Sequence, residues 1–472
     1  DGIKDFALTK SSVSEFDLYS SYTFLDNVLR GGLPISLKAK EGHVVFNVYS
    51  RKHGDLERDY NYFFLAPTFY SQGNGNYRDV NQNRRNDVWF NPHVKSSHLV
   101  SFMNLVQADG YNPLVVKGTM FSVRDKKEWD RILAQCVASK DREDVKAFVE
   151  KDFMPGDLLK YVMQNEIRLA VSPKVFLGKV LEVCHEQELA NHGEGFWSDH
   201  WTYNLDLIES YCSVYPEDLS GLLFKRKDFH FYHNNHYVLA RGHRYILTQR
   251  GVRQYGSVAK SSVVEGHVLR TNGGKGDIYS TTLICKILCL IANKAATLDP
   301  SGVGIEMEAD KPSWYDALNG LPGLLGSSVS ETFELKRLSL FVSDAISKLG
   351  LKNEEKILIF EELNDFIAGL NRVLSSQPDA QTYWEASSDL KERYRESIRH
   401  GISGKEAGMA VAEIKSFLKL IVARIEKGIA LATDSRGFLS TYFYHEVVEY
   451  EPLEKAGEHK ATYVKPLKFK RH

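Results

Sequence analysis

A tryptophan followed two residues later by an aspartate is the clearest candidate for chemistry in this sequence. Trp314 and Asp316 lie in the segment 311–320, which contains Pro312 and ends in a glycine-rich stretch. Proline and glycine both disfavour helix, so we expect a loop. An indole offers a flat apolar wall to a sugar, and an Asp whose pKa is raised by burial donates a proton. The alternative is structural: an Asp that caps the next helix beside a packed Trp.

Two earlier segments are also dense in polar and aromatic side chains. The first, 77–87, holds Arg, Asp, Gln and Asn side chains, whose donors and acceptors suit vicinal hydroxyls. Its alternative interpretation is a solvated charged turn. The second, 193–204, gathers two Trp, a Tyr, two carboxylates and a His, a mixture that is hard to explain as plain surface. The candidate substrate-binding residues are Arg78, Asp79, Gln82, Trp197, Asp199 and Trp314, and the candidate catalytic residue is Asp316.

The order of these segments resembles the motifs of the inverting glycoside phosphorylases typified by cellobiose phosphorylase. Residues 77–82 are similar to the family's Tyr-Arg-Asp-x-x-Gln segment, 106–110 to its Gln-x-x-Asp-Gly segment but one residue shorter, and 195–200 to Gly-Phe-Ser/Asn-Asp-Asp. Residues 314–316 are similar to Trp-Asn-Asp, whose Asp is the family's general acid. The resemblance extends from about Tyr60 to Leu431, and the insertions fit the β-1,3-glucan phosphorylase subgroup. It departs from the family at Asn83 and Ser313, where many members have Asp.

The resemblance implies inverting phosphorolysis of β-linked gluco-oligosaccharides to α-glucose 1-phosphate. Asp316 would protonate the glycosidic oxygen. Trp314 would pack its indole ring against the sugar, and Arg78 with Asp79 would hydrogen-bond to the hydroxyls of the sugar. Inorganic phosphate would be the co-substrate, and no cofactor is implied. Two alternatives stay open. One is an inverting hydrolase with Glu194 or Asp199 as the base that activates water. The other is a non-catalytic carbohydrate-binding domain.

The elements that must position these residues are mostly helices. Apolar residues at helical spacing predict helices over 128–137, 145–152, 158–169, 175–189, 205–211, 278–296, 335–349, 357–374, 384–398 and about 414–428. Alternating aromatic, branched and basic residues predict strands within 229–255 and 258–269. The resemblance implies an (α/α)6 barrel, so we expect a mainly α fold.

The predicted organisation has three parts. Residues 1–60 form a lead-in segment, and 61–440 form the (α/α)6-barrel catalytic domain with a β-rich insertion at about 225–277. Residues 441–472 form a C-terminal extension. The sequence starts without Met and ends in a basic tail, so we expect a piece excised from a longer multidomain protein.

The composition of the chain restricts the kinds of partner and the location that we expect. The chain has 60 basic and 61 acidic residues, a balance that disfavours nucleic acid and anionic membranes as partners. The expected partners are a β-glucan oligosaccharide or disaccharide and phosphate, and a homodimer is left open. The most apolar run, 283–292, is short and interrupted by Lys286, so no membrane span is expected. The five cysteines lack metal spacing and favour a reducing, cytoplasmic location.

The three histidines at 230, 233 and 236 are a further candidate for a metal site. On a strand His230 and His236 share a face that excludes His233, and no Cys or Glu completes a ligand set. We therefore predict no metal.

Overall fold

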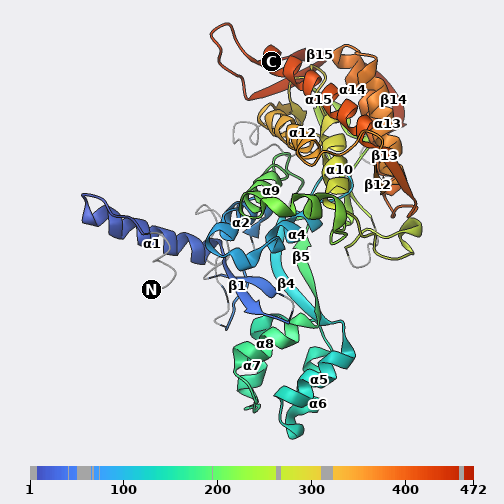
Figure 1. The fold of residues 1–472 in the computed structure, drawn as a ribbon. Coiled ribbons are helices and arrows are strands. Elements are labelled where there is room, and N and C mark those ends of the chain that lie inside the picture. The colour runs from blue at the N-terminus through green and yellow to red at the C-terminus, as the bar shows by residue number, and fades with distance from the viewer. Residues whose placement is uncertain are drawn as a thin grey trace. The chain divides into compact units, whose positions relative to one another are not determined.

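The computed structural model describes residues 8–40, 42–49, 65, 68–73, 75–193, 195–261, 267–309, 323–456 and 462–472. The chain divides into two compact units (Figure 1). The first comprises Asp1–Phe102, Leu114–Asn191 and Asp206–Val214, and the second comprises Met103–Pro113, His192–Leu205 and Tyr215–His472.

The first unit combines two small antiparallel sheets with helices. Strands β1 (Leu33–Lys38) and β2 (His43–Val48) form one sheet, and β3 (Gly75–Asn76), β4 (Val115–Val123) and β5 (Cys184–Asn191) form the other in that order. Its helices are α1 (Ser14–Gly31), α2 (Tyr77–Arg84), α3 (Asp87–Phe90), α5 (Lys126–Cys136), α6 (Arg142–Val149), α7 (Pro155–Gln164), α8 (Pro173–Glu182) and most of α4 (Ser97–Asn104) and α9 (Tyr203–Val214).

Helix α5 illustrates why these segments are helical. Asp125 precedes it and accepts a hydrogen bond from the backbone N–H of Glu128 at 3.0 Å, which satisfies one of the unpaired donors of the first turn. The helix buries Trp129, Ile132 and Leu133, with Cys136 one turn further, at the spacing of a single face. That face joins a hydrophobic core shared with α6–α8 and the strands β1, β2 and β4.

The second unit is built around one fully buried helix. All 13 residues of α10 (Leu283–Ala295) are buried, and the helix packs against α12 (Ser330–Lys348) and α13 (Glu361–Ser375) (Figure 1). Helices α14 (Ala380–Ile398) and α15 (Val411–Ala432) complete this group, and α13 packs against both. A helix buried on every side has little tolerance for charge, so its two lysines need specific surroundings.

A six-stranded antiparallel sheet forms the rest of the second unit. Its order is β10-β11-β14-β15-β7-β8, and two smaller pairs, β6–β9 and β12–β13, lie elsewhere in this unit. The strands are β6 (His236–Val238), β7 (Tyr245–Thr248), β8 (Gly251–Gln254), β9 (Val258–Lys260), β10 (Ile305–Glu306), β11 (Leu325–Ser328), β12 (Lys356–Phe360), β13 (Glu406–Ala410), β14 (Tyr442–Ala456) and β15 (Thr462–Arg471).

The sheet has its own apolar core. Tyr245, Val252, Leu325, Val447 and Val464 come from five different strands and pack together with Trp384 of α14. Burial of these side chains is what fixes the curled sheet against the helix.

The prediction of a mainly α, (α/α)6-barrel fold is wrong. About 47% of the structure is helix and about 23% is strand, including the curled six-stranded sheet, so the fold is mixed α/β. The sequence pattern misled in three places. The helix expected over 175–189 ends at Glu182 and the chain continues as β5, and the helix expected from 357 begins as β12. The strands β14 and β15 lie in the segment 442–471, where exposed charged residues mask the alternation.

Other helix predictions agree with the structure. Helices α5, α12, α14 and α15 lie where the apolar spacing indicates, and β6–β9 lie within the predicted strand region. In the described part of the chain, no helix combines the length and apolar character needed to cross a bilayer.

Candidate functional site

Three of the predicted site residues lie together on α2, in the first unit. The Asn76 side chain caps this helix by accepting a hydrogen bond from the Arg78 N–H at 3.0 Å. Arg78 is buried, and its Nε lies 3.0 Å from Oδ1 of Asp79. Gln82 is half-buried one turn further along. The segment is thus a largely buried helix and not a solvated turn.

Two more predicted residues lie in one loop of the second unit, just before α9. Asp199 is only 9% exposed, and its backbone carbonyl accepts hydrogen bonds from the N–H and the hydroxyl of Thr202. Trp197 is half-buried and stacks on His200 with 6.0 Å between ring centroids. The loop is anchored by Phe196, which is buried and stacks on Tyr111 at 4.8 Å. The structure therefore brings Trp197 and Asp199 together on a fixed backbone.

The proposed acid lies outside this description. Trp314, Asp316 and Glu194 are not among the described residues.

The residue that sequence reasoning missed is Lys294, near the end of α10. It is 5% exposed, and its Nζ lies 4.9 Å from the ring centroid of Tyr111 and 5.7 Å from that of Trp201. Among the described residues, its ammonium makes no hydrogen bond and no ion pair. Burial lowers the pKa of Lys294 to about 8, although the charge of Glu308 opposes this change. At neutral pH the Lys294 ammonium is therefore mostly charged, and no carboxylate of the described residues forms an ion pair with it.

Glu331 gives the same site a neutral carboxyl group. It is the second residue of α12 and 2% exposed, and its Oε2 is buried with no hydrogen-bond partner in the described ranges. Burial, reinforced by the negative charge of Asp199, raises the pKa of Glu331 to about 8. A helix N-terminus favours a carboxylate, but here desolvation outweighs that effect. Glu331 is thus protonated at neutral pH beside a second carboxyl group.

Glu308 holds the wall of this site in place. Its Oε1 accepts a hydrogen bond from the Tyr111 hydroxyl at 3.0 Å and lies 2.7 Å from Nη2 of Arg395. Its Oε2 lies 2.8 Å from Nζ of Lys391 and 3.4 Å from Nη1 of Arg244. Burial alone would raise the pKa of Glu308, but the three cations hold it well below the usual range. Glu308 is therefore a fixed anion that orients Tyr111 and Arg395.

We call Asp199, Lys294, Glu308 and Glu331, with the rings of Tyr111 and Trp201, the Lys294 cluster. Two carboxyl groups in different protonation states are the usual requirement for acid–base chemistry. A cation with no ion-pair partner among the described residues adds the capacity to hold a negatively charged reactant. The cluster combines both with aromatic walls.

A sequence signal for part of the cluster exists. Lys286 and Lys294 interrupt a run that is apolar on every face of its helix, and a buried lysine must either find acceptors or bind something. Lys286 finds acceptors, because its Nζ donates to the carbonyl of Val106 at 3.0 Å and to that of His230. Lys294 has no equivalent among the described residues.

No family model and no curated protein matches the sequence. Within the described ranges, no group of three or more His, Cys, Asp or Glu side chains is arranged to hold a metal ion.

Proposed function

We propose that this protein is an inverting glycoside phosphorylase that cleaves β-linked gluco-oligosaccharides and releases α-glucose 1-phosphate. The observation that carries the proposal is the buried ammonium of Lys294, which has no anionic partner among the described residues and lies beside two aromatic rings. A phosphorylase needs a place for inorganic phosphate, and a desolvated cation is such a place. The ordered motifs from Arg78 to Asp316 support the same function by resemblance alone.

In the proposed reaction a phosphate oxygen attacks the anomeric carbon while the bond to the glycosidic oxygen breaks. The leaving oxygen takes a proton from the Asp316 carboxyl, the role that the resemblance gives to this residue. Lys294 holds the phosphate, and Trp197 and Asp199 contact the sugar. As part of the same proposal, the reaction takes place in the cytoplasm, which fits five cysteines without disulfides.

The test is phosphate dependence. The full chain is incubated with cellobiose or laminaribiose with and without inorganic phosphate, and the products and their anomeric form are followed by NMR. We expect glucose 1-phosphate of the α-form only when phosphate is present. Asp316→Asn is expected to abolish the release, and Asp130→Asn, at an exposed position in the first unit, serves as the matched control.

Hydrolysis is the second candidate, and the carboxyl pair favours it. An inverting hydrolase needs a carboxylic acid and a carboxylate, and Glu331, whose pKa burial raises, lies close enough to Asp199 to feel its charge. Free glucose released at the same rate without phosphate would replace our proposal with this one. Sugar binding without turnover in either condition would indicate a non-catalytic carbohydrate-binding domain.

A further inference from the structure

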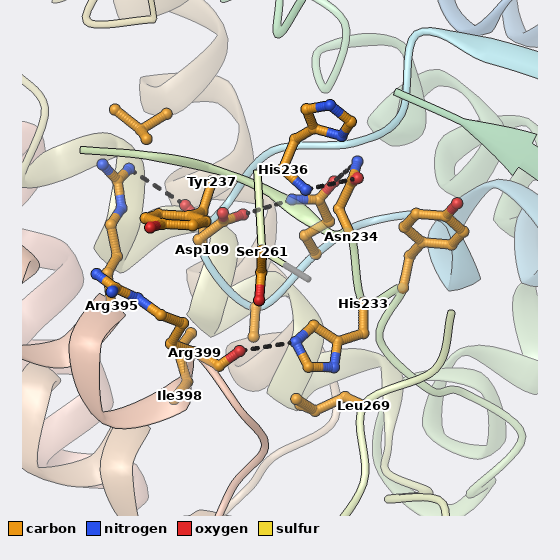
Figure 2. Close-up of a pocket in the computed structure, with 14 residues that line it drawn as sticks. Asp109, His233, Asn234, His236, Tyr237, Ser261, Leu269, Arg395, Ile398 and Arg399 are labelled. Carbon is orange, nitrogen blue, oxygen red and sulfur yellow. Dashed lines mark hydrogen bonds between the residues drawn. The ribbon is translucent and has the colours of Figure 1, made fainter. Parts of the chain in front are cut away.

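A small pocket in the second unit lies next to the Lys294 cluster and takes no part in the proposed reaction. It has a cavity volume of about 50 Å³ and is lined by residues that include Gln107, Asp109, Asn234, Tyr237, Arg395 and Arg399 (Figure 2). These residues come from the 107–109 loop, from β6 and the segment that leads into it, and from the C-terminal end of α14 with the residue that follows it.

The polar side chains of the pocket are held rigidly by one another. Asn234 donates from Nδ2 to Oε1 of Gln107 at 3.1 Å, and Gln107 donates from Nε2 to Oδ1 of Asp109 at 3.0 Å. The backbone N–H of Tyr111 also donates to this Oδ1, at 3.1 Å. Gln107 is 4% and Asn234 is 8% exposed, so the chain of hydrogen bonds is buried. Such a network presents its remaining donors and acceptors in fixed directions.

Two hydrogen-bonding atoms of residues that line the pocket have no partner among the described residues. Nε of Arg395 is buried and makes no hydrogen bond. Oδ2 of Asp109 accepts none, since the side-chain hydrogen bonds of this residue all go to Oδ1. One atom is a donor and the other an acceptor. A hydroxyl group can satisfy both, because it donates and accepts at once.

The charges at the pocket disfavour an anion. The carboxylate of Asp109 would repel it, and Arg395 is already engaged with Glu308 at 2.7 Å. The ring of Tyr237 offers an apolar face, and the guanidinium carbon of Arg399 lies 4.3 Å from its centroid. A carboxylate, amides, a guanidinium and an aromatic face together match the hydroxyl edge of a sugar.

The size of the cavity sets how much of a ligand enters. At about 10–15 Å³ for each water-sized group, the cavity holds roughly three to five such groups. That corresponds to adjacent hydroxyls of one sugar unit and not to a buried oligosaccharide.

We propose that this pocket is a second carbohydrate site, which binds vicinal hydroxyls of one sugar unit between Asp109, Asn234 and Arg395 with Tyr237 beside them. Arg395 connects it to the Lys294 cluster, because the same guanidinium contacts Glu308 and lies 5.4 Å from the Tyr111 centroid. The choice of a sugar as ligand rests on the proposed function. The existence of a binding site at this position is inferred from the pocket and its side chains alone.

The test is binding without turnover. D-Glucose is titrated into the full chain in phosphate-free buffer by calorimetry, and inorganic phosphate is titrated separately. We expect two glucose-binding components, one at Trp197 and Asp199 and one at the pocket, and Asp109→Asn and Tyr237→Ala are each expected to weaken the pocket component at least about tenfold, since each removes a polar or stacking contact. Tyr237→Phe, which keeps the ring, is expected to retain most of the affinity. Asp130→Asn and Tyr450→Ala, at exposed positions, are the matched controls.

The outcomes separate this proposal from the proposed function. Lys294→Met is expected to lose turnover and keep glucose binding. A protein that binds glucose through Asp109 and Tyr237 but never uses phosphate would sink the phosphorylase proposal and leave the pocket standing. A glucose titration with no component sensitive to Asp109→Asn and Tyr237→Ala, or one in which that component disappears with Lys294→Met, would overturn the second site. So would binding of phosphate and not glucose that depends on Asp109.

Discussion

The ammonium group of Lys294 is the residue-level feature on which the proposed binding of phosphate depends. We expect Lys294→Met to lower phosphate-dependent turnover by about 10²–10³-fold, because methionine keeps the apolar stem and removes the charge that would hold the anion. Steady-state kinetics with varied phosphate measures this, and the KM for phosphate should rise. Lys419→Met, at an exposed position of α15, is the control. An unchanged KM for phosphate would show that the anion binds elsewhere.

Glu331 should make the stability of the protein depend on pH. In the unfolded chain its carboxyl ionises near the usual pKa of 4.5, but in the folded protein burial raises the pKa to about 8. The folded state therefore holds the proton more tightly. Its contribution to stability is complete below about pH 4.5 and is lost as the pH rises through about 8.

The substitution Glu331→Gln should remove this dependence. We expect the urea midpoint of the variant to fall less between pH 5 and pH 8 than that of the native protein, because glutamine does not ionise. Glu354→Gln, at an exposed position, should leave the pH profile unchanged. An identical fall in the native protein and in Glu331→Gln would exclude Glu331 as the source.

Among individual residues, local sequence patterns identified Asp199 but missed Lys294 and Glu331. Asp199 was found because it lies in a short segment crowded with aromatic and polar side chains. Lys294 and Glu331 have no such neighbours in sequence, and Glu331 comes close to Asp199 and Lys294 only because α10 and α12 pack together. Local patterns do not contain that information.

Among the elements, α15 is positioned by one close backbone contact. A Cβ on Gly428 would lie 2.2 Å from the carbonyl oxygen of Gly302, which is backbone and cannot rotate away. We expect Gly428→Ala to destabilise the protein by about 1–3 kcal/mol, because the clash exceeds the gain in helix propensity. Urea denaturation followed by circular dichroism measures the change.

Gly369 on α13 is the matched control for that prediction. A Cβ there would lie 2.8 Å from Cδ2 of Leu390, a side-chain atom that is able to move. Gly369→Ala is therefore expected to change stability by no more than about 1 kcal/mol. Equal effects at the two glycines would contradict the idea that the Gly302 backbone limits the approach of α15.

The elements were predictable to very different degrees. The helical periodicity of α12, α14 and α15 is regular because one face of each meets the core. The strands β14 and β15 alternate buried and exposed residues only in part, and their exposed positions are charged. Their pairing also depends on distant partners, so their role in the sheet could not be read locally.

For the molecule as a whole, the core of the six-stranded sheet joins side chains from strands that lie far apart in the sequence. Val464 is fully buried among side chains from β7, β8, β11 and β14. We expect Val464→Ala to cost about 1.5–3 kcal/mol and to raise amide exchange in 245–254 and 442–447 together. Hydrogen exchange with mass spectrometry measures the exchange rates of both segments. Val448→Ala, at an exposed position, is the control. Faster exchange confined to β15 would show that the strands are not one cooperative unit.

The order of the strands in this sheet has a consequence for synthesis on the ribosome. Strand β7 pairs with β15 through Ile246 and Tyr463, so β7 emerges about 200 residues before its partner. At about 5–20 residues per second this interval is roughly 10–40 s, during which the β7–β8 hairpin has an open edge. The nascent chain therefore carries an unpaired strand edge until β15 has been synthesised.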